Sequence, residues 1–198
     1  MPLAAELKAD FEWAKSIAVG PGLSMNVAAA EITRCVLETD DKVRILDADA
    51  LNIIAGEHID YKGSREGQII ITPHIMEMSR LTGKTVADIK EHMIESAKEY
   101  AIQHSCICIL KDARTVVTDG QKVYINCTGN DGMSTGGCGD VLTGLIAGMT
   151  AMGLDAFEAA CLSVYVHGKA GDYAASGKGR AGMTAADVSE AIAYVLKR

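Results

Sequence analysis

Residues 106–126 read CICILKDARTVVTDGQKVYIN, and this stretch decides which kind of sheet the chain forms. Its first part, Cys106–Leu110, is a continuous apolar run, which is typical of a strand buried on both faces of a parallel sheet. Two further short runs, Thr115–Thr118 and Lys122–Asn126, flank Asp119-Gly120, a dipeptide typical of a β-hairpin. The stretch therefore predicts a mostly parallel sheet with an antiparallel hairpin at one edge.

The residues before this stretch alternate between short apolar runs and longer amphipathic segments. Strands are expected at the apolar runs Ser16–Val19, Val43–Leu46 and Gln68–Ile71. Helices are expected over Glu6–Lys15, Asn26–Glu38, a stretch through Ile54, and Thr85 to about Gln103. Such alternation indicates an α/β fold, a parallel sheet with helices on both faces.

After the hairpin the chain is expected to be helical almost to its end. The expected helices are Val141–Met152, Ala156 to about Ala175, and Ala185–Leu196, with Thr184 as a cap. Residues Gly177–Arg180 between two of them are expected to form a mobile loop. No repeat or interdomain linker interrupts the 198 residues, so we expect a single nucleotide-binding domain over 1–198.

Composition narrows the function classes. Hydrophobic residues make up 48% and charged residues 23%, which excludes disordered and fibrous proteins. The net charge of −7 argues against nucleic acid or an anionic membrane as a partner and favours a small molecule. Six cysteines without a C-x-x-C pair, and no secretion signal or long apolar stretch, predict a cytoplasmic protein without disulfides or a zinc site.

Glycines are concentrated in one segment. Seven of them fall within twenty residues: Gly129, Gly132, Gly136, Gly137, Gly139, Gly144 and Gly148. The loop Thr128–Asp140 runs directly into a predicted helix, so unpaired backbone N–H groups and the positive end of a helix dipole meet there. A merely flexible loop is the alternative, but dense glycine before a helix start favours an anion site, most simply for phosphate.

Polar residues follow each predicted strand, and they should meet at the carboxyl edge of the sheet. They are Gly20–Gly22, Asp47 with Asp49 and Asn52, Thr72–His74 with Glu77, Lys111 with Arg114 and Thr115, and the glycine loop. Asp140 either caps a helix or accepts the proton of a hydroxyl that attacks a phosphoryl group. His74 is either a loop histidine or functional. Lys111 and Arg114 either end a solvated strand or contact a nucleotide.

Several standard motifs are absent. The chain has neither a P-loop nor a dinucleotide-binding glycine fingerprint. Gly132–Gly136 matches G-x-S-x-G, but a nucleophile elbow needs a strand that leads directly into a helix. Here the predicted strand ends near Asn126 and the helix starts near Gly139, so a serine hydrolase is not expected.

Several segments together are similar to one known family. They are Leu46–Asn52, Thr72–His74 with Glu77 and Arg80, Lys111–Thr115, Thr118–Gly120, Thr128–Gly144, His167–Asp172 and Gly182–Asp187. From about Ile17 to the end, the chain resembles the ATP/ADP-dependent NAD(P)H-hydrate dehydratases. The resemblance implies a ribokinase-like three-layer α/β/α sandwich. It also implies a metabolite-repair reaction, in which a nucleotide phosphorylates the ring hydroxyl of hydrated NADH or NADPH and phosphate then leaves.

The resemblance also implies roles for individual residues. Asp140 is the implied base, and the backbone of Gly137, Cys138 and Gly139 is the implied anion hole. The implied nucleotide contacts are Lys111, Asp112, Ala113, Arg114, Thr115, Asn130 and Gly139. The implied contacts to the hydrated dinucleotide are Gly22, Asn52, His74 and Asp140. Mg²⁺ is expected to accompany ATP or ADP, and no metal ligand is assigned on the protein.

The chain departs from the family pattern at several positions. Ile75 and Met76 stand where Pro-Gly is usual, Ser24 and Asp112 stand for glycine, Asp131 for proline, and Cys138 often for serine. The family's leading segment before the first predicted strand is expected to be missing, which predicts either a longer gene or a homo-oligomer that covers the exposed sheet edge. Two alternatives therefore stay open: a small-alcohol kinase such as a hydroxyethylthiazole kinase, and a nucleotide-binding remnant.

Overall fold

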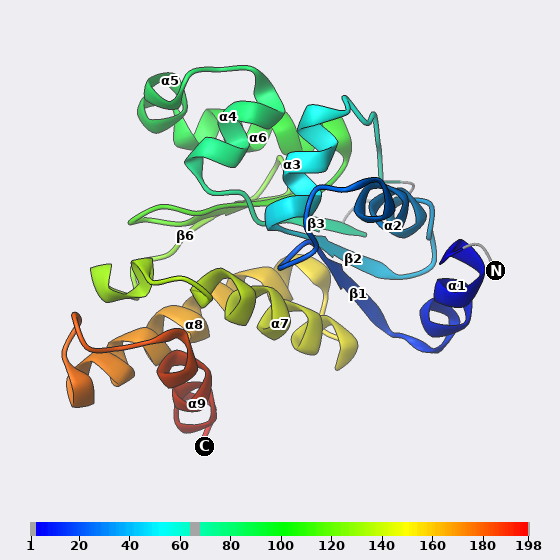
Figure 1. Ribbon diagram of the computed structural model, residues 1–198. Helices are drawn as coiled ribbons and strands as arrows, with labels where there is room; N and C mark the ends of the chain where they lie inside the picture. Colours follow the sequence, from blue (N-terminus) through cyan, green and yellow to red (C-terminus); the bar gives the residue numbers. More distant parts are fainter. Residues whose placement is uncertain (1–2, 64–67, 198) are drawn as a thin grey trace.

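A six-stranded sheet lies between two layers of helices (Figure 1). The computed structural model describes residues 3–63 and 68–197. The strands are β1 (Ser16–Val19), β2 (Val43–Leu46), β3 (Ile69–Ile71), β4 (Ile107–Leu110), β5 (Val116–Thr118) and β6 (Val123–Ile125). They lie side by side in chain order; β1 to β4 are parallel, and β5 and β6 each run antiparallel to the preceding strand. The predicted sheet with its antiparallel edge is confirmed.

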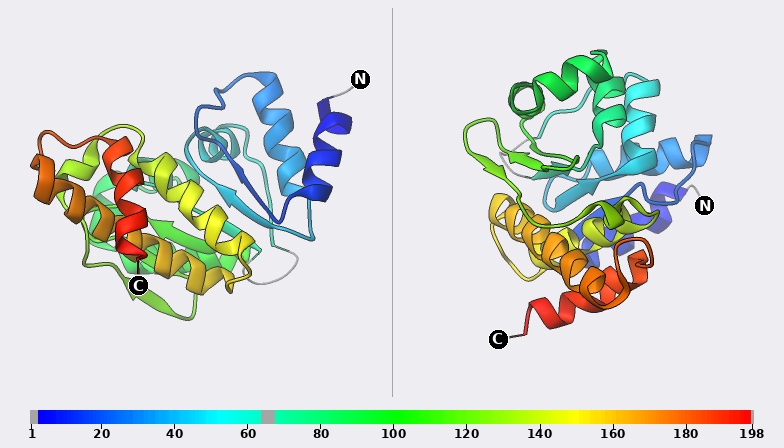
Figure 2. Two further views of the ribbon diagram at one scale, coloured as in Figure 1. Left: turned by 90° about the horizontal axis from the view of Figure 1, so that it is seen from below. Right: turned by 90° about the vertical axis from the view of Figure 1, so that its left-hand side faces the viewer.

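Helices cover both faces of the sheet (Figures 1 and 2). One layer contains α2 (Val27–Leu37), α3 (Ala48–Gly56), α4 (Ile75–Thr82), α5 (Val86–Glu91) and α6 (Met93–His104). The opposite layer contains α7 (Cys138–Ala151), α8 (Ala156–Lys178) and α9 (Ala185–Val195). The first helix, α1 (Leu3–Trp13), lies beside α2. The predicted three-layer α/β/α sandwich is therefore confirmed.

The apolar strands are continuous because both of their faces are buried. Ile45 and Ile70 belong to the core beneath α7 and α8, whereas Leu46 and Ile71, one residue further along, belong to the core on the other face. All four side chains are inaccessible to solvent. Alternating residues thus fill two separate cores, which explains why most strand positions are apolar. Ser16 of β1, Arg44 of β2 and Thr118 of β5 are the polar exceptions in the parallel strands and the first strand of the hairpin.

Two local predictions differ from the structure, and one short element in the glycine loop was not predicted. The single helix expected from Thr85 to about Gln103 is wrong: α5 and α6 are separated at His92, whose backbone (φ −127, ψ 48) is not helical. The predicted loop Gly177–Arg180 is partly wrong, because α8 continues through Lys178 and ends at Gly179 with φ +73. A short 3₁₀ helix, η1 (Asp131–Ser134), lies within the glycine loop. The pattern of apolar residues along the sequence continues through His92, so it does not show that the backbone of this one residue is not helical.

Helix α8 presses closely on the glycine loop through two glycines of its own. A Cβ on Gly168 would lie 2.2 Å from the Thr128 hydroxyl oxygen and 2.8 Å from the Thr128 carbonyl oxygen. A Cβ on Gly171 would lie 2.2 Å from the Met133 sulfur. The Thr128 hydroxyl also donates a hydrogen bond to the Tyr165 carbonyl at 3.0 Å. The absence of side chains at these two positions lets α8 hold the loop in place.

We expect opposite effects from the same substitution at two positions of α8. Gly168→Ala should lower the free energy of unfolding by about 1–3 kcal/mol, since its Cβ meets backbone that cannot move aside. Gly177→Ala, which meets no atom within 4 Å, should raise it by about 0.5–1 kcal/mol through helix propensity. Urea denaturation measures both. Equal stabilities of the two variants would contradict the close approach of α8 to Thr128.

Candidate active site

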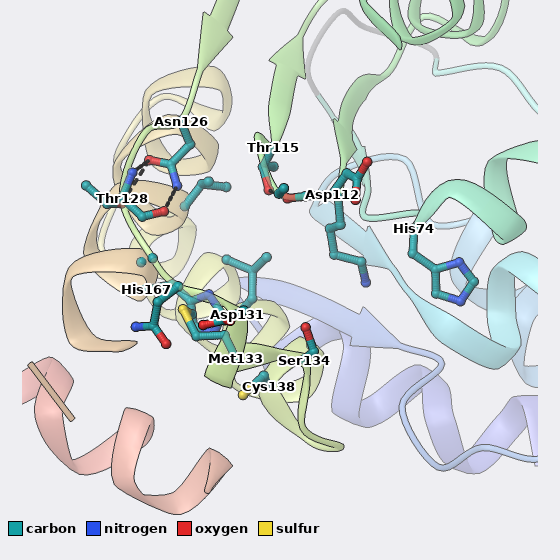
Figure 3. A pocket seen from close by; sticks show the side chains of 18 of the residues that line it. His74, Asp112, Thr115, Asn126, Thr128, Asp131, Met133, Ser134, Cys138 and His167 are labelled. Atoms are coloured by element: carbon teal, nitrogen blue, oxygen red, sulfur yellow. Dashed lines mark hydrogen bonds between the residues drawn. The ribbon is translucent and has the colours of Figure 1, made fainter. Parts of the chain in front are cut away.

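A cavity of about 650 Å³ opens at the carboxyl edge of the sheet (Figure 3). Its walls come from the turn between β4 and β5, from the loop over residues 126–137, from the start of α7 and from α8. In Figure 3, Asn126 and Thr128 lie at one end of the cavity and His74 lies at the other, with Cys138 between them on the side of the loop. This is the edge at which ligands of open α/β sheets bind.

The first turn of α7 faces the cavity. Gly137 precedes the helix with φ +91, a backbone conformation that favours glycine. Gly137, Cys138 and Gly139 all line the cavity. The first N–H groups of a helix have no partner within the helix, and the helix dipole adds positive potential at this end. The start of α7 can therefore receive an anion.

A buried ion pair lies beneath this turn. Lys111 Nζ donates a hydrogen bond to Asp47 Oδ1 at 2.8 Å, and the Thr143 hydroxyl donates to Asp47 Oδ2 at 2.8 Å. These three residues stand at the end of β2, just after β4 and in α7. A Cβ on Gly139 would lie 3.6 Å from Lys111 Nζ and 3.7 Å from Asp47 Oδ2, so the turn rests on the pair.

The Asp47 carboxylate is ionised in this environment. Burial acts to raise its pKa, but the charge of Lys111 and the hydrogen bonds from Lys111, Thr72 and Thr143 outweigh burial and leave the pKa below its ordinary value. The Asp47 side chain is 2% exposed and the Lys111 side chain 22% exposed. The sequence identifies Asp47 only as a polar residue after a strand, within a family-like segment. Its pairing with Lys111 depends on the spatial order of the strands.

The glycine loop is held in place by Asp172 of α8. The Gly129 N–H donates to Asp172 Oδ2 at 3.1 Å, and the Asn130 side-chain amide donates to Asp172 Oδ1 at 3.1 Å. The other end of the Asn130 amide, its oxygen, accepts from the Gly132 N–H at 3.0 Å. The loop is therefore a fixed wall of the cavity.

Most of the residues proposed from sequence line this one cavity. They are His74, Lys111, Asp112, Ala113, Arg114, Thr115, Asn130, Gly137, Cys138 and Gly139. Asp140 lies just outside the lining, on the exposed side of the first turn of α7, and its carboxylate makes no hydrogen bond to any described residue.

His74 connects the cavity lining to α4, a helix outside it. It forms a parallel bridge with Lys111, and it begins α4, a helix that the sequence analysis did not identify. Its Nδ1 accepts hydrogen bonds from the N–H groups of Met76 and Glu77, both at 3.1 Å. Because Nδ1 accepts, the neutral ring carries its proton on Nε2. His74 is thus a helix cap that also faces the cavity.

The other two residues proposed for the dinucleotide lie away from the cavity lining. Asn52 Oδ1 accepts a hydrogen bond from Arg80 at 2.6 Å. Gly22, with φ +65, lies in the turn after β1. Nearby Ser24 has φ +72, a conformation that favours glycine, and its N–H donates to Asp49 at 2.7 Å. The structure does not bring Gly22 and Asn52 into the cavity with His74.

Comparison with known proteins places the chain in a family. The family model described as NAD(P)H-hydrate dehydratase matches residues 2–194. The chain belongs to the NAD(P)H-hydrate dehydratase family. It is 45% identical over 183 residues to the bifunctional NAD(P)H-hydrate repair enzyme of Moorella thermoacetica, covering 91% of this chain and 34% of that protein. It is 35% identical to the ADP-dependent (S)-NAD(P)H-hydrate dehydratase of Neisseria meningitidis, covering 91% of this chain and 62% of that protein.

Solved structures agree with this assignment. The ADP/ATP-dependent NAD(P)H-hydrate dehydratase of Bacillus subtilis, co-crystallised with ATP and Mg²⁺, superposes with a TM-score of 0.82 at 32% identity, covering 91% of this chain and 63% of that one. A ribokinase-like superfamily protein of Enterococcus faecalis superposes with a TM-score of 0.85 at 27% identity, covering 96% of this chain and 66% of that one. The ribokinase-like fold is confirmed. The chain spans about one third to two thirds of the length of these family members. Within its described residues, no helix is both long and apolar enough to cross a membrane.

Removing the charge of Asp47 should destabilise the protein. Asp47→Asn leaves Lys111 without its counter-ion, so we expect the free energy of unfolding to fall by about 2–3 kcal/mol in urea denaturation at pH 7. The matched control is Asp41→Asn. Its carboxylate is 74% exposed and pairs with Lys42, so it should contribute less than about 1 kcal/mol.

The pH dependence of this difference tests its electrostatic origin. Because folding lowers the pKa of Asp47, its contribution is present above the ordinary pKa of 3.8 and is lost as the pH falls through the lower folded-state value. The gap between wild type and Asp47→Asn should therefore narrow below about pH 4. A gap that stays constant down to acid unfolding would show that Asp47 acts by packing alone.

Proposed function

We propose that this chain carries the nucleotide-dependent dehydration of hydrated NADH or NADPH. The observation that supports this most directly is the start of α7, which faces the cavity above the Asp47–Lys111 pair, with Asp140 in the same helical turn. The family's members named above carry the same activity in their names. Those relatives are longer than this chain, so the assay described below must be carried out on this chain itself.

In the proposed first step, Asp140 removes the proton of the ring hydroxyl. The hydroxyl oxygen forms a bond to the terminal phosphorus of ATP or ADP, and the bond from that phosphorus to the bridging oxygen breaks. The N–H groups of Gly137 and Gly139 would stabilise the negative charge on the phosphoryl oxygens, as fixed donors do in a water-excluded site. The N–H of Cys138 donates to the Thr135 carbonyl at 3.4 Å and would leave this long bond to join them. The free Asp140 carboxylate, bonded to no described residue, is available for this role.

In the second step phosphate leaves the ring carbon, and a proton leaves the neighbouring carbon. The ring regains its double bond, so the products are the reduced cofactor, inorganic phosphate and ADP or AMP. Lys111, Arg114 and Asn130, all in the cavity lining, would contact the nucleotide. His74, which also lines the cavity, would lie toward the dinucleotide, whereas Gly22 and Asn52 could contact only a part of it that extends beyond the lining.

Mg²⁺ is proposed to arrive with the nucleotide. Among residues 3–63 and 68–197 no group of three His, Cys, Asp or Glu side chains could hold a metal ion. The Asp47 carboxylate, which lies beneath Gly139, already binds Lys111 and Thr143. The residues therefore fit a cation held mainly by phosphate oxygens and water, the usual arrangement for Mg²⁺. Such a cation would reduce the charge of the phosphates.

A small-alcohol kinase is the competing enzyme. The hydroxyethylthiazole kinase of Pyrococcus horikoshii superposes with a TM-score of 0.74, but at 15% identity this likeness concerns the fold alone. The cytoplasmic location stays a prediction. A homo-oligomer also stays a prediction; β1 forms one edge of the sheet, and unpaired strand edges are commonly covered.

A spectrophotometric assay tests the activity. With ATP or ADP and Mg²⁺, the protein should restore the dihydronicotinamide absorbance of hydrated NADH or NADPH. Phosphorylation of hydroxyethylthiazole without this recovery would support the kinase instead. A rise in melting temperature with ATP or ADP, but no turnover of either substrate, would support a nucleotide-binding remnant.

Asp140→Asn tests the base. The amide keeps the size of the side chain but cannot take up the proton, so kcat should fall by about 10²-fold or more while nucleotide affinity stays within a few fold. Asp88→Asn is the matched control, because Asp88 is likewise an exposed acid in the first turn of a helix, α5, and does not line the cavity. If the two variants turn over at the same rate, Asp140 is not the base, and its role is limited to a favourable interaction with the helix dipole.

A further inference from the structure

His167 occupies an unusual place in the cavity wall. It belongs to α8, it is only 9% exposed, and it lines the cavity together with Val164 and Gly168 of the same helix. In the sequence, His167 belongs to a family-like segment, and with Asp155 it follows the G-x-S-x-G match in the order of a serine hydrolase, a function that is not expected here. Cys138, the first residue of α7, lines the same cavity, and its backbone is a hydrogen-bonding group that acts on the pKa of the His167 ring.

The position of the His167 ring is fixed by its neighbours along α8. One turn or less on either side, Tyr165 accepts a hydrogen bond from the Thr128 hydroxyl, and Gly168 contacts the Thr128 backbone. Further along, Asp172 binds the loop at Gly129. Helix α8 therefore cannot slide or rotate against the loop without breaking these contacts, and His167 is held where it meets α7.

The ring is neutral and incompletely bonded. Burial lowers the pKa of His167 to about 4, the backbone of Cys138 acts in the opposite direction, and the charge of Lys111 adds to the lowering. Its Nε2 is buried and makes no hydrogen bond to any described residue. Buried polar atoms without partners are rare and destabilising. The unpartnered Nε2 of His167 therefore indicates that this histidine has a functional role in the cavity wall.

We propose that His167 is a positioning residue, whose imidazole supports the first turn of α7 through the backbone of Cys138 and so aims the N–H groups of that turn at a bound phosphate. The proposal rests on the proposed nucleotide site. Cys138 is the first residue of α7, and the turn that it begins contains Gly139 and Asp140. A hydrogen bond that is poorly aligned in the free protein commonly tightens when the ligand binds. A bound phosphate would draw the turn into the position that His167 supports.

The test compares two ligands in the intact protein. In His167→Phe, ADP should bind about tenfold more weakly than in wild type, because its phosphates use the turn, whereas adenosine should bind within twofold of wild type. Isothermal titration with each ligand gives the two ratios. The melting temperature without ligand should stay the same or rise, since the substitution removes an unpartnered buried nitrogen. His167→Gln, which keeps a side-chain hydrogen-bonding group, should recover part of the ADP affinity.

Three results would overturn the proposal. They are equal losses for ADP and adenosine, a lower melting temperature in His167→Phe with no selective loss for ADP, and no recovery in His167→Gln. His92→Phe is the control, because His92 is exposed and does not line the cavity. Since these readouts use binding and not turnover, they stay informative if the chain proves inactive as a dehydratase. In an active chain, kcat should fall in His167→Phe with little change in the KM of hydrated NADPH.

Discussion

The ion pair between Asp47 and Lys111 is the interaction on which the site depends. It connects the end of β2 to the end of β4 across the intervening β3, and Thr143 ties α7 to the same carboxylate. A buried carboxylate is strongly destabilising without its partner, so these three elements cannot separate independently. The distance between the first turn of α7 and the sheet is thereby fixed. Gly139 has no side chain, so this turn packs directly on the Asp47–Lys111 pair.

The same pair determines which charges remain available to a ligand. Since Asp47 already balances Lys111, the attraction for an anion comes largely from backbone N–H groups, the α7 dipole and the exposed Arg114. Such donors need a rigid backbone to be effective. The glycine-rich loop acquires its rigidity from α8, through Asp172 and through the close approach that Gly168 permits. A segment that is flexible by composition thus becomes a fixed wall of the cavity.

The sequence by itself determined the layers and the location of the site. Strands such as Ile107–Leu110 read as continuous apolar runs because two cores bury alternate residues, and Asp119-Gly120 marks the hairpin because few other dipeptides adopt its backbone angles. The cluster of glycines before a predicted helix start predicted an anion site, because unpaired backbone N–H groups and a helix dipole meet there. The resemblance to the dehydratases, confirmed by the family match, placed most of the candidate residues around one cavity.

Only the tertiary structure decided which polar residues meet. Asp47 lies 64 residues from Lys111 and 96 from Thr143, and their contact depends on strand order and helix packing, which no local pattern encodes. The burial of His167 likewise depends on how α8 crosses the start of α7. The break at His92 and the capping of α4 by His74 are also tertiary results, since amphipathic periodicity is unchanged by one non-helical residue. Local sequence limits backbone angles and burial, whereas pairing between distant residues is set by the assembled fold.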